Sequence, residues 1–322
     1  MKAIVQHKFG SPDVLELRDI DKPAIGDDQV LIRVRATSVN PYDWHMMTGT
    51  PYIARISAGL LKPKQTTPGV DVAGTIESVG KNVTQFQPGD EVFGGSPGAF
   101  AEYARARAEG IVLKPANLTH EQAAAVTLAG LTALQGLRDK GRIQPGHRVL
   151  INGASGGIGT FAVQIAKALG AEVTGVCSTR NVDMVRSIGA DHVVDYTAED
   201  FTERGQHYDL FLDLVGNRSL SECGNVLTPD GVYVAVSGPK KNRLLGPLMR
   251  TLRLLLVSRL GSHKMVGMLT GRTQEDLLYL KDLLETGKVT PVIDRQYGLA
   301  HAPEAMRHQG EGHAQGKTVI TV

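Results

Sequence analysis

The feature that most constrains the fold of this chain is a strand that runs into a glycine-rich turn and then a helix, at residues 148–171. A short apolar run is followed by four glycines within seven positions, and apolar side chains then recur at helical spacing. Glycines let backbone N–H groups approach a diphosphate, and the helix N-terminus adds partial positive charge. A turn that uses glycine for tightness alone is the alternative, but the flanking strand and helix argue against it. We predict a dinucleotide site at Ala154, Ser155, Gly156, Gly157, Ile158 and Gly159.

The end of the next predicted strand, at 172–177, indicates which dinucleotide binds. Sites for NAD usually place an acidic residue there, which binds the 2′-hydroxyl of the ribose. This chain has no carboxylate at that place and instead carries Ser178, Thr179 and Arg180, which suit a 2′-phosphate. We therefore predict NADP(H). The alternative for Arg180 is an ordinary solvated side chain in a loop.

The chain is long enough for two domains, because 322 residues exceed what one hydrophobic core usually supports. Short alternating strands separated by Pro and Gly predict an all-β, barrel-like half before about residue 120. Strands alternate with helices from 147 to about 237, which predicts a doubly wound parallel sheet. We predict an α/β protein with a catalytic domain at 1–122, completed by 288–322, and a nucleotide-binding domain at 123–287.

Three segments complete this secondary-structure prediction. Thr119 can cap a long helix that continues to Leu137, with Glu121 and Gln122 in its first turn. Leucines at helical spacing predict another helix at 274–286. The tail at 290–322 is again β-like, so we expect it to rejoin the first half.

Composition excludes several classes of protein. A net charge of +2 gives no support for nucleic-acid binding. Two cysteines, Cys177 and Cys223, cannot form a disulfide framework, which favours a reducing compartment, and we expect the cytoplasm. The strand-like run at 1–5 leads us to expect no signal or transit peptide. No stretch approaches 18 uncharged apolar residues, so we expect no membrane span.

Five motifs outside the glycine turn carry a resemblance to a known family. They are Ser38-Val-Asn-Pro-Tyr-Asp-Trp44, Pro68-Gly-Val-Asp-Val-Ala-Gly-Thr-Ile-Glu-Ser-Val-Gly80, Phe86-x-Pro-Gly-Asp-Glu-Val-Phe93, Ala99-Phe-Ala-Glu-Tyr103 and Leu128-Ala-Gly-Leu-Thr-Ala133. With the glycine turn they span essentially the whole chain, which resembles the medium-chain dehydrogenase/reductase superfamily, in particular its zinc-free quinone oxidoreductase and enone reductase branch. The resemblance implies a GroES-like β-barrel catalytic domain joined to a Rossmann domain, an active site in the cleft between them, and a homodimer.

The same residues predict that no metal binds. Catalytic zinc uses three protein ligands and an open position. Zinc-dependent relatives carry Cys where this chain has Asn40, and a His-Glu pair where it has Val70-Asp71. No cysteine precedes Cys177, so the structural-zinc cluster of such relatives is absent as well.

Without a metal, the reaction must depend on the coenzyme. We expect hydride transfer from NADPH to a small lipophilic acceptor, either a quinone or the C=C bond of an α,β-unsaturated carbonyl. The oxyanion that forms needs a hydrogen-bond or proton donor. Tyr42 and Tyr52 are candidates, as are the coenzyme 2′-hydroxyl and water. The alternative for each tyrosine is a packed ring with a solvated hydroxyl, and Asn40 and Asp43 could instead organise their loop.

The family resemblance also implies which residues contact the coenzyme. It implies that Asn40 lies beside the nicotinamide, and that other coenzyme contacts come from Thr127, Tyr196, Val215, Gly238 and Lys317. An alternative function is an NADPH-binding scaffold or redox-sensing protein with little turnover, since the glycine turn would serve both.

One segment departs from these patterns. Residues 231–274 contain eight Lys or Arg and no Asp or Glu, and 247–259 reads as an amphipathic helix. One interpretation is peripheral contact with an anionic membrane or a partner through 244–260. The favoured alternative is a flap and dimer contact that buries the apolar stripe.

Overall fold

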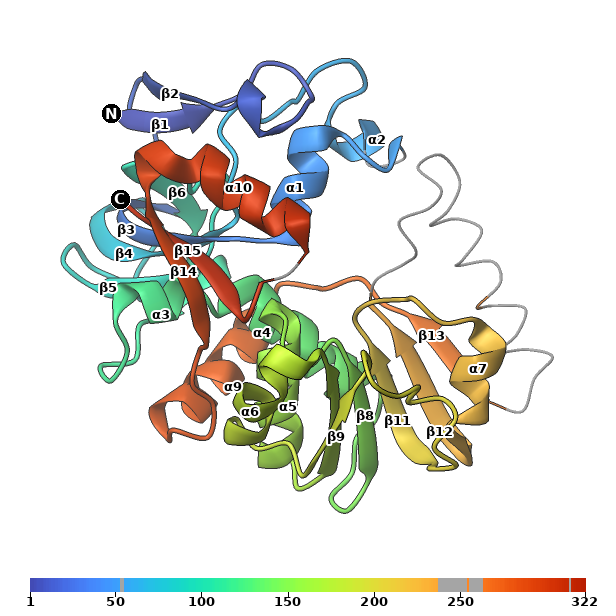
Figure 1. The fold of residues 1–322 in the computed structure, drawn as a ribbon. Coiled ribbons are helices and arrows are strands. Elements are labelled where there is room, and N and C mark those ends of the chain that lie inside the picture. Colours follow the sequence, from blue (N-terminus) through green and yellow to red (C-terminus); the bar gives the residue numbers. More distant parts are fainter. Residues whose placement is uncertain (53–54, 237–253, 255–262, 313) are drawn as a thin grey trace. The chain divides into compact units, whose positions relative to one another are not determined.

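The computed structural model describes the whole chain except residues 53–54, 237–253, 255–262 and 313. The chain forms two compact units (Figure 1). Unit 1 comprises Met1–Leu131, Gly271–Thr286 and Pro291–Val322, and unit 2 comprises Thr132–Thr270 and Gly287–Thr290. These units are groups of residues in mutual contact, which do not by themselves define domain boundaries. The boundaries expected from the sequence therefore stay a prediction.

Unit 1 contains a seven-stranded sheet in the order β14-β15-β3-β4-β5-β7, with β6 also paired to β3. Its strands are β3 (Gln29–Val39), β4 (Asp71–Val79), β5 (Glu91–Gly95), β6 (Tyr103–Arg107), β7 (Ile111–Leu113), β14 (Ile293–Gly298) and β15 (Lys317–Thr321). Two more strands, β1 (Lys2–Val5) and β2 (Glu16–Asp19), pair with each other. The expected return of the tail is confirmed, because β15 pairs antiparallel with β3 and places Thr318 opposite Val39.

The barrel core follows from alternation along these strands. In β3, Val30, Ile32 and Val34 are buried and the arginines between and after them are exposed, as expected for a sheet with one face in the core. These valine and isoleucine side chains pack with Val72, Ile76, Val92 and Ile111 from the neighbouring strands.

The helices of unit 1 are α1 (Pro41–Thr48), α2 (Arg55–Ala58), α3 (His120–Ala124), α4 (Thr127–Gln135, which continues into unit 2), α9 (Gln274–Glu285) and α10 (Ala302–Glu311). The predicted helix at 274–286 is confirmed by α9. The single long helix from Thr119 to Leu137 is wrong, because the chain breaks after α3 and restarts at Thr127. The physical reason is that the amide of Leu128, at the new helix start, donates to the carboxylate of Asp71 at 3.1 Å.

Unit 2 contains a six-stranded sheet in the order β10-β9-β8-β11-β12-β13, in which every paired strand is parallel. The strands are β8 (Arg148–Asn152), β9 (Glu172–Cys177), β10 (His192–Asp195), β11 (Tyr208–Asp213), β12 (Leu227–Ala235) and β13 (Lys264–Gly267), and the helices include α5 (Gly157–Ala168), α6 (Val182–Ser187) and α7 (Leu220–Asn225). The order reverses at β8, which lies between β9 and β11. Ligands of doubly wound sheets bind at such a switch point, beyond the carboxyl ends of the strands.

All five predicted strands of this sheet are present, whereas β13 was not predicted. The predicted helix at 247–259 lies outside the described residues, apart from Leu254, which is buried in the core of unit 2. Within the described ranges, no helix combines the length and the apolar character needed to cross a bilayer.

Phe211 anchors the core of unit 2, where its ring meets Phe201 edge-on at 5.9 Å and Tyr233 at 5.2 Å. We expect Phe211→Ala to lower the free energy of unfolding by about 3–5 kcal/mol, because a fully buried aromatic ring leaves a cavity. Urea unfolding followed by circular dichroism measures this change. Leu269→Ala, at a side chain that is 95% exposed, is the matched control and should change stability by less than about 0.5 kcal/mol.

Candidate functional site

The glycine turn connects β8 to α5 as predicted, with Gly156 as the N-cap. Gly153 has φ +90°, a backbone conformation that favours glycine. A Cβ on Gly159 would lie 2.1 Å from the carbonyl oxygen of Gly153, so only glycine fits there. A Cβ on Gly156 would meet nothing nearer than that same oxygen, at 3.5 Å, which leaves open space in front of the turn. The first amides of α5 have no intrahelical acceptor and suit a diphosphate in that space.

Asp213 supports the turn from the neighbouring strand, and sequence reasoning missed it. This carboxylate is fully buried at the end of β11. It accepts hydrogen bonds from Asn152 Nδ2 at 3.0 Å, the amide of Val215 at 3.1 Å and the hydroxyl of Tyr233 at 2.6 Å. The loop after β11 is thereby held so that Val215 packs against Gly153, where a Cβ would meet it at 2.9 Å. Val215 is 43% exposed beside the turn, and its contact with a coenzyme stays a prediction.

Ser178, Thr179 and Arg180 follow β9, and Arg180 is exposed. Asn181 comes next and is only 4% exposed. Its side-chain amide donates to Ser155 Oγ of the glycine turn at 2.9 Å and to Ser178 Oγ at 3.3 Å. Asn181 therefore connects the segment expected to bind the diphosphate with the segment expected to bind the adenosine ribose. The sequence analysis missed this residue.

The end of β9 itself carries no carboxylate, as the sequence shows, but a carboxylate from the neighbouring strand lies beside it and was missed. Thr179 Oγ1 donates to Asp195 Oδ2 at 2.6 Å, and Thr197 also donates to Asp195. These hydrogen bonds hold the pKa of the Asp195 carboxyl below its usual value, so it carries a negative charge at neutral pH. Asp195 is the last residue of β10, and the pairing of β10 with β9 places it beside Cys177. Tyr196 follows it and is 51% exposed.

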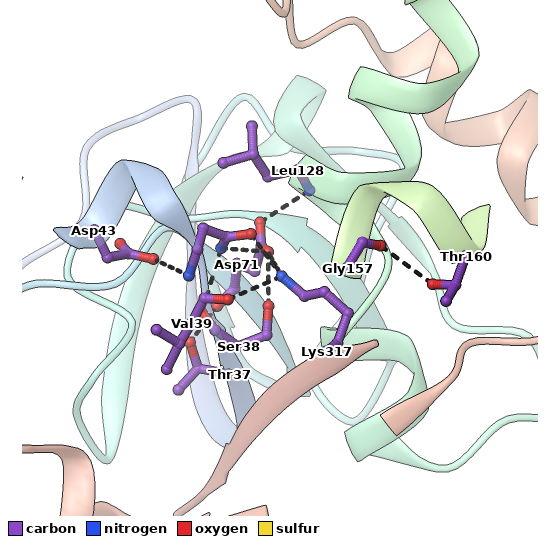
Figure 2. Close-up of polar contacts among 10 residues, drawn as sticks. Thr37, Ser38, Val39, Asp43, Asp71, Leu128, Gly157, Thr160 and Lys317 are labelled. Carbon is purple, nitrogen blue, oxygen red and sulfur yellow. Dashed lines mark hydrogen bonds and ion pairs between the residues drawn. The ribbon is translucent and has the colours of Figure 1, made fainter. Parts of the chain in front are cut away.

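In unit 1, a buried polar cluster forms around Asp71 (Figure 2). Asp71 Oδ2 accepts from Ser38 Oγ at 2.8 Å and from Asn40 Nδ2 at 2.9 Å, and Asp71 Oδ1 accepts from the Leu128 amide. Lys317 Nζ donates to Asn40 Oδ1 at 2.6 Å and to the carbonyl oxygen of Val39 at 3.0 Å. Strand register explains this meeting, because Thr318 lies opposite Val39 and so Lys317 lies next to Asn40.

The charges of this cluster are almost completely shielded from water. Asn40, Asp43, Asp71 and Lys317 are each at most 3% exposed. Lys317 Nζ lies 3.9 Å from Asp71 Oδ2. Burial, with the nearby Asp71 charge, raises the pKa of Asp43 to about 7. Burial also lowers the pKa of Lys317, although Asp71 and Asp43 oppose that change.

The sequence analysis named Asn40 and Lys317 as coenzyme contacts, and the structure brings these two residues together. It did not predict that Asp71 and Ser38 belong to the same cluster. Thr127 is fully buried at the start of α4, and its hydroxyl has no partner among the described residues. Tyr42 and Tyr52 lie outside the cluster and are 45% and 44% exposed. Gly238 lies outside the described residues.

Comparison with known proteins gives these features a family. Residues 26–116 match the alcohol dehydrogenase GroES-like domain, and 188–320 match the zinc-binding dehydrogenase model. The mitochondrial NAD(P)H oxidoreductase RTN4IP1 of Mus musculus is 34% identical, over 100% of this chain and 89% of its own. The 2-methylene-furan-3-one reductase of Solanum lycopersicum is 33% identical, over 99% of this chain and 79% of its own. The solved Escherichia coli quinone oxidoreductase complexed with NADPH has a TM-score of 0.86 at 25% identity, over 100% of both chains.

The fold, the glycine turn and these relatives define an oxidoreductase that uses a nicotinamide coenzyme. It is built from a GroES-like domain and a Rossmann sheet. The chain belongs to the medium-chain dehydrogenase/reductase superfamily, in its zinc-free quinone oxidoreductase branch. The fold class and the family predicted from the motifs are therefore confirmed. Among the described residues, no three His, Cys, Asp or Glu side chains are grouped to hold a metal ion.

Asp43 makes stability depend on pH in a predictable direction. Between about pH 4 and its folded pKa of about 7, the folded chain keeps a proton that the unfolded chain has lost, so stability falls as pH rises. Asp43→Asn removes this effect and can still accept from the Asn40 amide. The difference in unfolding free energy between the variant and the parent should therefore increase by about a few kcal/mol, in favour of the variant, as the pH rises from about 4 to about 8.

Urea unfolding of the coenzyme-free protein at constant ionic strength measures this gain. Asp183→Asn, at a fully exposed aspartate of α6, is the control and should show little change with pH. A gap between Asp43→Asn and the parent that stays constant with pH would contradict the effect of burial on Asp43.

Asn181 gives a second prediction, about coenzyme affinity. Asn181→Ala removes both hydrogen bonds to Ser155 and Ser178, so we expect the affinity for NADH and for NADPH to fall together, by roughly tenfold. Fluorescence titration with each coenzyme measures the two affinities. Asn225→Ala, at an exposed position of α7, is the control. Loss of affinity for one coenzyme alone would show that Asn181 does not connect the two segments.

Proposed function

We propose that this chain is an NADPH-dependent reductase that transfers a hydride to a quinone or to the β-carbon of an α,β-unsaturated carbonyl, without a metal. The observation that carries the proposal is the carboxyl edge of the parallel sheet. There the glycine turn follows β8, and Ser178 and the exposed Arg180 follow β9. Asn181 joins the two segments. This edge offers backbone amides to a diphosphate and a guanidinium to a second phosphate.

The preference for NADPH rests on opposing charges. Arg180 attracts a 2′-phosphate, whereas the ionised Asp195, hydrogen-bonded to Thr179, repels it. A guanidinium can bind a phosphate through two parallel hydrogen bonds, and we expect that interaction to dominate. The bound NADPH of the Escherichia coli relative supports this choice.

The acceptor follows from the chemistry that this coenzyme supplies. Bound NADPH provides a hydride from C4 of its nicotinamide. Addition to a quinone, or to the β-carbon of an enone, leaves an oxyanion or enolate that then takes one proton. The Solanum lycopersicum relative, a 2-methylene-furan-3-one reductase, supports an α,β-unsaturated ketone as one acceptor class.

The side chains named above differ in whether they can supply the proton that the reduced acceptor takes up. Asn40 has no titratable proton, and both ends of its amide are committed to Lys317 and Asp71. Its role is therefore to position neighbouring groups. Tyr42 and Tyr52 have exposed rings and can exchange a proton with water. We propose that one of these phenols, or water itself, protonates the product.

Metal independence, a cytoplasmic location and a homodimer belong to the same proposal. The ammonium of Lys317, hydrogen-bonded to Asn40, would repel a divalent cation from this cluster. Cys177 and Cys223 are buried and are not joined in a disulfide, and burial raises the pKa of the Cys177 thiol to about 11, so that thiol stays neutral. Cysteines outside disulfides suit a reducing compartment.

The decisive experiment follows NADPH absorbance with quinones, enones and alkenals, in the presence of a chelator. We expect turnover with NADPH to exceed that with NADH. Arg180→Ala should raise KM for NADPH by roughly 10- to 100-fold and change KM for NADH little, because a charge-assisted hydrogen bond is lost. Tight coenzyme binding without turnover on any acceptor would instead favour the scaffold function.

A second variant should change KM for NADPH in the opposite direction. Asp195→Asn keeps an acceptor for Thr179 and removes a negative charge, so KM for NADPH should fall while KM for NADH changes little. Arg186→Ala, at an exposed arginine of α6, is the control for loss of a nearby cation. If both Arg180→Ala and Asp195→Asn leave the ratio of KM for NADH to KM for NADPH unchanged, the 2′-phosphate is not bound at this edge.

A further inference from the structure

One stretch of unit 1 exposes an unusual amount of apolar surface. Twelve large apolar side chains are exposed among the described residues, and five of them lie between positions 42 and 61. Ile56 is 69% exposed, Leu60 71% and Leu61 93%. Scattered single exposures are normal, whereas a concentration of this kind marks an interaction surface.

The backbone holds two of these leucines at the tip of a closed loop. The amide of Lys64 donates to the carbonyl oxygen of Ala58 at 2.7 Å, which closes residues 58–64 after α2 (Figure 1). Gly59 has φ +117°, and a Cβ there would lie 2.1 Å from the carbonyl oxygen of Lys62. Leu60, Leu61 and Lys62 are therefore presented by a tight turn.

The base of the loop is packed against the barrel unit. Arg55 donates from Nε to the carbonyl oxygen of Gly49 at 3.0 Å. Its guanidinium carbon lies 4.6 Å from the ring centre of Phe9 and 4.8 Å from that of Tyr52. These contacts anchor α2, so the exposed tip projects from a fixed support.

The charge of this stretch has one sign. Residues 44–70 contain Arg55, Lys62 and Lys64 and no Asp or Glu. Lys62 and Lys64 are exposed beside the two leucines. Apolar side chains next to lysines, with no acidic residue nearby in the sequence, are complementary to an anionic lipid surface.

We propose that Ile56, Leu60, Leu61, Lys62 and Lys64, the 56–64 surface, contact an anionic lipid bilayer. The leucines would enter the boundary between headgroups and acyl chains, and the lysines would lie at the lipid phosphates. A symmetric contact with a second copy is disfavoured, because it would bring the lysines together without an acidic residue of this stretch to pair with them. This stretch of sequence differs from the basic residues 244–260 considered in the sequence analysis.

Cosedimentation of the full-length protein with vesicles tests the proposal. Vesicles of phosphatidylcholine with phosphatidylglycerol should bind the parent at least roughly tenfold better than phosphatidylcholine alone, and added salt should weaken the binding. Leu60→Ser with Leu61→Ser should reduce binding to the anionic vesicles by roughly tenfold or more, and so should Lys62→Glu with Lys64→Glu.

Matched controls separate this surface from general effects. Leu269→Ser with Leu278→Ser changes exposed leucines elsewhere, and Lys81→Glu changes an exposed lysine elsewhere. Both should bind vesicles like the parent. Circular dichroism and coenzyme titration establish that each variant is folded.

Three results would overturn the proposal. One is equal or absent binding to the two kinds of vesicle. Another is unchanged vesicle binding in both 56–64 variants, with a raised KM for a water-soluble acceptor, which would make the surface part of an acceptor site. The third is unchanged vesicle binding with a lower mass of the leucine variant in analytical ultracentrifugation, which would make it a contact between copies. Vesicle binding and sedimentation do not depend on the proposed coenzyme preference or on turnover with any acceptor, so they can fail or succeed independently of the proposed function.

Discussion

The buried carboxylate of Asp71 is the constraint on which the polar cluster of the barrel unit depends. A carboxylate removed from water needs hydrogen-bond donors, and leaving one unmatched costs several kcal/mol. Its donors come from Ser38 on β3, from Asn40 at the start of α1 and from the amide of Leu128 in α4. One side chain at the start of β4 thus holds two segments that lie far apart in the sequence, residues 38–40 and the start of α4. It also stops α3 and α4 from being one helix.

The Rossmann unit uses the same device twice. Asp213 gathers Asn152, the Val215 loop and Tyr233 around the end of the central strands. Asn181 spans from Ser178 to Ser155. In both cases a buried polar side chain makes these hydrogen bonds only when two loops hold one arrangement, so the turn is preorganised. Preorganisation lowers the entropy lost when a coenzyme binds.

Local patterns predicted much of this protein because their causes are local. The glycine turn, five of the six strands of the parallel sheet and α9 depend on spacing within a few residues, and the β-like tail carried its own signal. Asp71, Asp195 and Asp213 were missed as site residues because their partners are distant: Asp71 meets Leu128 across 57 positions, and Asp195 meets Thr179 across 16. Lys317 was named from family resemblance, but only strand register explains why it reaches Asn40.

The balance of charge in the barrel unit bears on the proposed chemistry. Two carboxyl groups, Asp43 and Asp71, share one buried ammonium, that of Lys317. Because the pKa of Asp43 is raised to about 7, this carboxyl gains a proton near neutral pH, and one carboxylate then faces one ammonium. If Asn40 lies beside the nicotinamide, as the family resemblance implies, a cluster without excess negative charge repels less the oxyanion that forms when the acceptor takes a hydride. Deprotonation of Asp43 would then add a charge that opposes that step, so the burial that makes stability fall as pH rises would also favour the proposed reduction at or below neutral pH.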